Sequence, residues 1–226
     1  MPEENGRAAG ESLAALLAGG EAGHPALIVP DSGEVLTYTQ VATRVEALAQ
    51  RLAGMGVRRG DRVALALPNG PDVVLLLLAV TALGAAAAPL NPAYTATEYQ
   101  FFLTDIAPRL MLIPASGAAA ATAAATGITE IGVRPTGDGP PELLADGQAA
   151  TLQRAFEPGS PEDVALILHT SGTTSRPKQV PLRQRNLMAS ARTILAPARP
   201  GSRSPNSAAR PTARGRAGSN RPARMI

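Results

Sequence analysis

One short segment of the chain concentrates side chains that could bind a phosphate group. It follows an apolar run at residues 164–169 and reads Thr170-Ser171-Gly172-Thr173-Thr174-Ser175-Arg176-Pro177-Lys178. Hydroxyl groups donate hydrogen bonds to phosphate oxygens, and a glycine lets successive backbone N–H groups approach an anion closely. Lys178 adds a compact positive charge on a flexible stem. The segment therefore predicts a site for a polyphosphate at the carboxyl end of a buried strand, where open α/β sheets bind ligands.

Composition supports this interpretation. The chain has 20 Arg and a single Lys, and that Lys lies in the hydroxyl-rich segment. The spacing excludes a Walker loop, because that loop has a second glycine directly before its lysine. The alternative is that the segment is only a solvated connection, as most stretches rich in Ser, Thr, Gly and Pro are.

Several other classes of site are excluded or disfavoured. The 226 residues include no Cys, so there is no disulfide, thiolate metal site or cysteine nucleophile. The two histidines, His24 and His169, stand 145 positions apart, and we expect no metal site from them. We expect a solvated turn position for His24. For His169, which ends a buried strand, we expect a hydrogen-bonded structural role in preference to base catalysis.

The elements that must position the site follow from the apolar pattern. Short apolar runs alternate with helical segments, which favours an α/β fold with a parallel-rich sheet flanked by helices. Helices are expected at 12–18, 39–54 (with Thr39 as the cap), 71–83, 97–103 and 118–125. Strands are expected at 26–30, 34–38, 62–67, 85–90, 110–113, 128–133 and 164–169. Residues 134–160, rich in Gly and Pro, are expected to form an exposed excursion.

The longest uncharged stretch, residues 73–90, raises the alternative of a membrane span. Asn69-Gly70-Pro71-Asp72 precedes it and is a helix-start signal, while Gly84 and Pro89 interrupt it. We therefore expect a buried helix followed by a buried strand, and no membrane span.

The segment LILHTSGTTSRPKQVPL, residues 166–182, resembles the nucleotide-binding signature of the adenylate-forming acid–CoA ligase superfamily. Residues 36–103, LTYTQVATRV through YQFFL, are similar in order and spacing to the family's N-terminal portion. The resemblance extends over about residues 12–190 and implies the N-terminal part of an AMP-binding domain over residues 1–190. His169 and the Ser175-Arg176 pair look most like the oxalate–CoA ligase branch of plants and fungi.

The resemblance implies a two-step reaction. A small carboxylic acid attacks the α-phosphate of ATP, bound with Mg²⁺, and the thiol of CoA then displaces AMP from the acyl-adenylate. Carried over by position, the residues that would cradle the ATP phosphates are Thr170, Ser171, Gly172, Thr173, Thr174 and Lys178. Gln179 departs from the family's usual glycine, and a Cβ there would restrict the loop if that position needed a positive φ.

The later motifs of the family do not follow residue 190. The ribose-binding aspartate, the hinge and the mobile domain with its catalytic lysine are missing, so we expect no catalytic residue and no complete turnover in this chain. Thr136-Gly137-Asp138 matches the family's Thr-Gly-Asp triplet, but it precedes the phosphate segment and is interpreted as coincidence. A hydroxycinnamate or fatty acid–CoA ligase, or a non-catalytic phosphate-binding module, remain alternatives.

Charge is distributed unevenly. Residues 1–190 hold 13 basic and 18 acidic groups for a net charge of −5, whereas residues 191–226 hold eight Arg and no acid. We expect residues 191–226 to be a disordered, Arg/Pro/Ala-rich tail from a shifted reading frame or a mis-spliced exon. The alternative is a basic arm that binds nucleic acid or anionic membranes. Because the tail has no aromatic residues between its arginines to stack on bases, we expect no nucleic-acid partner.

The two ends of the chain suggest a compartment. The start, Met1-Pro2-Glu3-Glu4, lacks the positive charge of a secretory signal, and the end, Arg224-Met225-Ile226, is not a peroxisomal address. The expected location is the cytosol, and the peroxisome is an alternative for full-length relatives.

Overall fold

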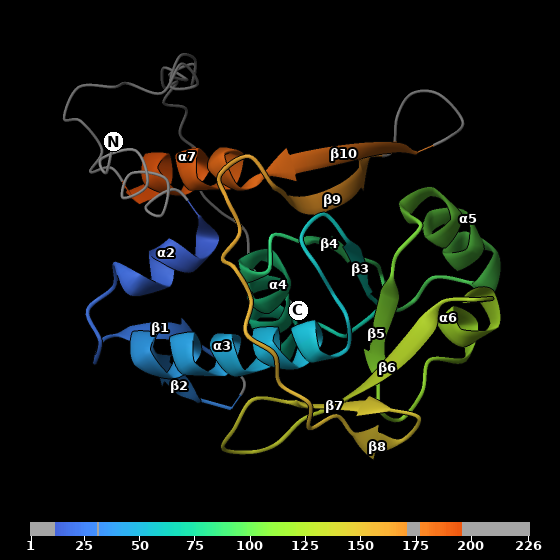
Figure 1. Ribbon diagram of the computed structural model, residues 1–226, viewed down its shortest axis with the longest axis horizontal. Helices are drawn as coiled ribbons and strands as arrows, with labels where there is room; N and C mark the ends of the chain where they lie inside the picture. Colours follow the sequence, from blue (N-terminus) through green and yellow to red (C-terminus); the bar gives the residue numbers. More distant parts are fainter. Residues whose placement is uncertain (1–11, 31, 171–176, 196–226) are drawn as a thin grey trace, which may run out of the picture.

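The computed structural model describes residues 12–30, 32–170 and 177–195 (Figure 1). An eight-stranded sheet is flanked by helices on both faces, and a two-stranded sheet lies beside it. The expected α/β class with a parallel-rich sheet is confirmed.

The chain enters the fold through a short helix and a hairpin. Helix α2 (Leu13–Ala18) begins after its cap Ser12, and strands β1 (Pro25–Ile28) and β2 (Val35–Thr37) pair antiparallel. Helix α3 (Tyr38–Gly54) is capped by Thr37, so the predicted cap, Thr39, is two residues too late. The reason is the third residue after the cap: the side chain of Gln40 accepts a hydrogen bond from the Thr37 N–H, which completes a capping box.

Five strands of the large sheet run parallel, and antiparallel strands extend it at both ends. Its order is β10-β9-β4-β3-β5-β6-β7-β8. The parallel strands are β3 (Arg62–Leu65), β4 (Ala86–Pro89), β5 (Leu110–Pro114), β6 (Thr129–Arg134) and β9 (Val164–Thr170). Strands β7 (Glu142–Ala145) and β8 (Gln148–Ala149) extend one end, and β10 (Lys178–Arg183) pairs antiparallel with β9 at the other.

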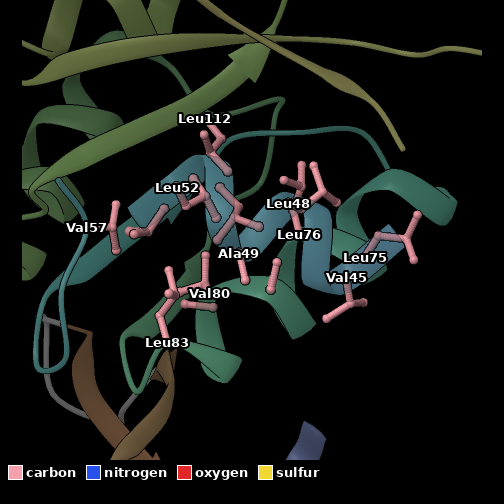
Figure 2. Close-up of a cluster of buried hydrophobic side chains, with 14 of the residues drawn as sticks. Val45, Leu48, Ala49, Leu52, Val57, Leu75, Leu76, Val80, Leu83 and Leu112 are labelled. Atoms are coloured by element: carbon pink, nitrogen blue, oxygen red, sulfur yellow. The ribbon is translucent and has the colours of Figure 1, made fainter. Parts of the chain in front are cut away.

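Alternate residues of the strands supply two cores. Helices α3 and α4 (Pro71–Ala82) cover the face that carries Val63 and Leu65, whereas α5 (Ala96–Ile106) and α6 (Ala119–Ala124) cover the face that carries Ala64 and Ala66 (Figure 1). Figure 2 shows the first core, where Leu48 and Leu52 of α3 meet Leu76 of α4. Because successive side chains of a strand point to opposite faces, neighbouring residues of a buried strand pack under opposite helical layers.

Residues 73–90 form most of helix α4, a turn at Gly84 and strand β4, so the helix followed by a strand that we expected here is confirmed. Gly84 has a φ of +69°, which the turn requires. No helix in the described part of the chain is long and apolar enough to cross a membrane.

Two segments differ from the expectation. The excursion predicted at 134–160 contains strands β7 and β8, and Leu143 of β7 is only 1% exposed. Beyond the phosphate segment, β10 and α7 (Gln184–Leu195) were not predicted. Residues 191–195, which we assigned to the disordered tail, belong to α7; the rest of that tail lies outside the described residues.

Candidate functional site

Strands β9 and β10 bring two of the predicted phosphate-binding residues together. Lys178 is the Cα partner of Thr170 in the antiparallel register, and the next pair is Gln179 with His169 (Figure 1). This places the hydroxyl of the one strand and the ammonium of the other at the end of the hairpin where the connecting segment begins. The other predicted phosphate-binding residues, Ser171, Gly172, Thr173 and Thr174, lie outside the described residues.

The side chain of Lys178 is exposed, and no described residue forms a hydrogen bond or ion pair with it. The arginine at the other end of the same strand differs: Arg183 pairs with Glu162. A lysine without a partner near a hydroxyl provides a charge and hydrogen-bond donors for an anion. The donor set at this end of the hairpin thus fits phosphate oxygens.

One residue pair further into the hairpin, His169 and Gln179 both contact Asp105 of helix α5. The Nε2 atom of His169 lies 2.8 Å from Oδ2 of Asp105, and the imidazole side chain is 8% exposed. The ring also makes an edge-on contact with Phe102, with 4.8 Å between ring centroids. These contacts agree with the structural, hydrogen-bonded role predicted for His169.

Gln179 takes part in the same cluster. Its side-chain amide donates to the backbone oxygen and to Oδ2 of Asp105, each at 3.3 Å. Among the described residues, the non-glycine positions with positive φ are Ala107 and Asp146, so the backbone of Gln179 needs no left-handed conformation. The Cβ of Gln179 therefore does not restrict the backbone at this position. No sequence signal indicated Asp105, because its role depends on the docking of α5.

A separate cavity of about 760 Å³ lies at the carboxyl ends of β3, β5 and β6. Strand β4 lies on one side of β3 and β5 on the other, so the cavity occupies the topological switch point of the sheet. Its lining includes Asn69, Asp72 and Ser116. Sequence reasoning identified Asn69 and Asp72 only as a helix start, because the strand order was not known.

The carboxyl group of Asp72 is electrostatically perturbed. Its pKa is raised, first by burial and then by the nearby Glu34 carboxylate, while Arg44 opposes the shift.

Thr136 of the Thr-Gly-Asp triplet donates a hydrogen bond from its hydroxyl to the backbone oxygen of Pro140, at 3.0 Å. That hydrogen bond joins residues four positions apart within one turn.

Comparison with known proteins decides the family. The model of the AMP-binding enzyme family matches residues 17–208. The chain belongs to the AMP-binding enzyme family.

Individual relatives agree. This family member is 41% identical over 169 residues to a Humulus lupulus protein named "Probable CoA ligase CCL9", covering 72% of the chain and 32% of that protein. It is 41% identical over 166 residues to the oxalate–CoA ligase of Arabidopsis thaliana, covering 71% of the chain and 32% of that protein. The crystal structure of ATP-bound MatB from Rhodopseudomonas palustris matches 81% of the chain and 37% of its own length, with a TM-score of 0.65 and 29% identity. The chain thus spans about a third of the length of these relatives.

Proposed function

We propose that this chain is the N-terminal part of an AMP-forming acid–CoA ligase and that the β9–β10 hairpin binds the phosphates of ATP. One observation carries the proposal: Thr170 and Lys178, which has no partner among the described residues, face each other in register where the hydroxyl-rich segment begins. The membership of the AMP-binding enzyme family and the ATP-bound structural neighbour support the choice of ligand.

The chemistry asked of these residues is neutralisation and orientation of phosphate oxygens. In the proposed reaction the oxygen of a carboxylate attacks the α-phosphorus of ATP, a P–O bond to pyrophosphate breaks, and an acyl-adenylate forms. Lys178 would offset the negative charge of the phosphates, and Thr170, Ser171, Gly172, Thr173 and Thr174 would donate hydrogen bonds to them. Mg²⁺ would accompany ATP. In the second step the thiol of CoA would displace AMP.

For the acid, we propose an oxalate-like dicarboxylate. The 41% identity to the Arabidopsis oxalate–CoA ligase supports it, as do His169, Ser175 and Arg176 of the phosphate segment. Other relatives are named for sulfoacetate and 4-chlorobenzoate, so these two acids are the comparison substrates. Because the chain spans about a third of its relatives, we propose that it does not complete acyl-CoA formation alone.

The first test is equilibrium binding of Mg-ATP to the 226-residue chain. Lys178→Ala should weaken binding by roughly 10-fold or more, because a charge-assisted hydrogen bond to an anion is lost. Arg183→Ala is the matched control, since it removes a cation from the same strand, and it should leave the dissociation constant within about twofold. No ATP binding, or equal losses in the two variants, would overturn the phosphate site.

A second test addresses the reaction and the acid. In a version extended to the full length of the relatives, pyrophosphate release should depend on the acid and be fastest with oxalate. Binding of ATP without acid-dependent pyrophosphate release would indicate a phosphate-binding module in place of a ligase.

A further inference from the structure

One carboxylate contacts both strands of the hairpin that carries the proposed phosphate site. Asp105 lies 2.8 Å from His169 on β9 and 3.3 Å from the side-chain amide of Gln179 on β10. His169 and Gln179 are themselves direct cross-strand partners. The three side chains, which we call the Asp105 anchor, therefore join α5 to both strands at one level of the hairpin.

The anchor lies one residue pair away from the proposed phosphate ligands. Thr170 and Lys178 form the next pair in the register, and side chains alternate faces along a strand. The anchor side chains therefore point toward α5, whereas those of Thr170 and Lys178 point to the opposite face. This arrangement lets the anchor fix the backbone at the site without occupying the space that a ligand would use.

Helix α5 is a rigid support for the carboxylate. Tyr99, Leu103 and Ile106 are each at most 3% exposed in the core beneath the helix. The hydroxyl of Tyr99 also donates to the backbone oxygen of Asn91, at 2.9 Å. The same core includes residues of β3, β4 and β5 as well as Ile167 of β9, so Asp105 is held by a helix whose packing extends well beyond the hairpin.

We propose that Asp105 is a positioning residue that holds the two strands together beside the phosphate site and so sets the placement of Thr170 and Lys178. The identity of the ligand rests on the proposed function; the anchor itself does not. A glycine at position 179, the residue usual in the family, has no side-chain amide to donate. The Gln179 contact is therefore a feature of this chain, and it ties β10 directly to α5 where glycine would leave only the contact through β9.

The experiment compares Gln179→Gly with Gln148→Gly in the full chain. Gln148 is an exposed glutamine in strand β8, so its replacement matches the loss of side chain and the gain of backbone entropy. Two quantities are measured: hydrogen-exchange rates of the amides at 168–170 and 178–180, and the dissociation constant for Mg-ATP. Gln179→Gly should raise both by about fivefold, whereas Gln148→Gly should change neither.

Variants of Asp105 test the carboxylate directly. Asp105→Ala removes the carboxylate that both strands contact, leaving only the backbone oxygen of residue 105 for Gln179, and should raise both quantities further. Asp105→Asn keeps a side-chain acceptor oxygen, so both quantities should stay close to the wild-type values. If Asp105→Ala does not fold, Gln179→Gly and Asp105→Asn carry the test. Unchanged exchange rates in Gln179→Gly would overturn the anchor even if ATP binds. If the wild-type chain binds no ATP, the proposed function fails, and faster exchange in Gln179→Gly alone would still support the anchor.

Discussion

Gln184 on α7 forms a hydrogen bond with Leu13 on α2, although the two residues are 171 positions apart. Its Oε1 accepts from the backbone N–H of Leu13 at 3.0 Å, and its Nε2 donates to the backbone oxygen of Thr81 on α4 at 2.9 Å. The residue is 1% exposed, and both ends of its amide are satisfied. A single buried side chain therefore joins three helices from the beginning, the middle and the end of the described chain.

Gln184→Leu should lower the free energy of unfolding by roughly 1–3 kcal/mol, because it leaves the buried backbone N–H of Leu13 unpaired. It also removes one of the hydrogen bonds that the Thr81 carbonyl accepts, another coming from the Gly84 N–H. Urea denaturation measures the change. Gln100→Leu, at an exposed position of α5, is the control and should stay within about 0.5 kcal/mol of the wild type. Equal effects at the two glutamines would contradict this role for Gln184.

The core between α3 and α4 should be sensitive to truncation. Leu76 is fully buried and packs in the cluster shown in Figure 2. Leu76→Ala should cost about 2–5 kcal/mol, from the lost transfer free energy and the cavity left behind. Leu152 is 68% exposed, so Leu152→Ala should change the free energy of unfolding by no more than about 0.5 kcal/mol. Thermal or urea unfolding of both variants distinguishes the two positions.

The start of α5 should contribute to a pH dependence of stability. The pKa of Glu98 is lowered from 4.5, first by the hydrogen bond from the Thr95 backbone N–H and then by the one from the Thr95 hydroxyl. A lowered folded pKa gives stability that is present above the unfolded pKa and is lost as the pH falls through the folded value. Glu98→Ala should therefore destabilise the chain at about pH 7, and this penalty should shrink as the pH falls below 4.5 and the carboxylate becomes protonated.

Glu98→Gln is the control for the capping box, because its amide oxygen accepts hydrogen bonds at both pH values. Its stability relative to the wild type should improve on acidification. A Glu98→Ala penalty that is as large at low pH as at neutral pH would show that the charge of Glu98 does not matter.

Lys178 can be examined by chemical labelling because it is the only lysine of the chain. An amine-reactive reagent should modify Lys178, whose side chain is exposed and has no partner among the described residues, and Mg-ATP should slow that modification. Mass spectrometry of the peptide containing residue 178 gives the rate, with the N-terminal amine as an internal reference. Equal protection of both amines would show that ATP does not act at Lys178.

The alternating helices and strands between residues 35 and 134 could be predicted because their apolar patterns are strong. Arg62–Leu65 and Leu110–Pro114 are short buried strands, and Pro71 marks the start of α4 at the expected residue. Local signals were sufficient for these elements. They did not determine the strand order, and so neither the cavity at the switch point nor the contact between Asp105 and the hairpin could be foreseen.

The segments that were not predicted have conflicting local signals. Strand β10 contains Pro181, which disfavours a central strand but is tolerated in an edge strand such as this one. Between 134 and 160, the Gly and Pro content indicated a loop, yet Gly159 is needed for packing. A Cβ there would lie 2.4 Å from Nε2 of Gln184 and 2.8 Å from the backbone oxygen of Thr81. Such a requirement for close approach is visible only once distant segments are brought together.

The place of β9 in the sheet has a consequence for biosynthesis. Strands β3 to β6 lie within residues 62–134, whereas β9 begins at Val164 and pairs with β4. At a synthesis rate of about 5–20 residues per second, the ribosome synthesises the central strands several seconds before β9, the strand that pairs with the edge of β4. During that interval the nascent chain exposes the unpaired edge of β4, where a chaperone can bind and where association with other chains is most favourable.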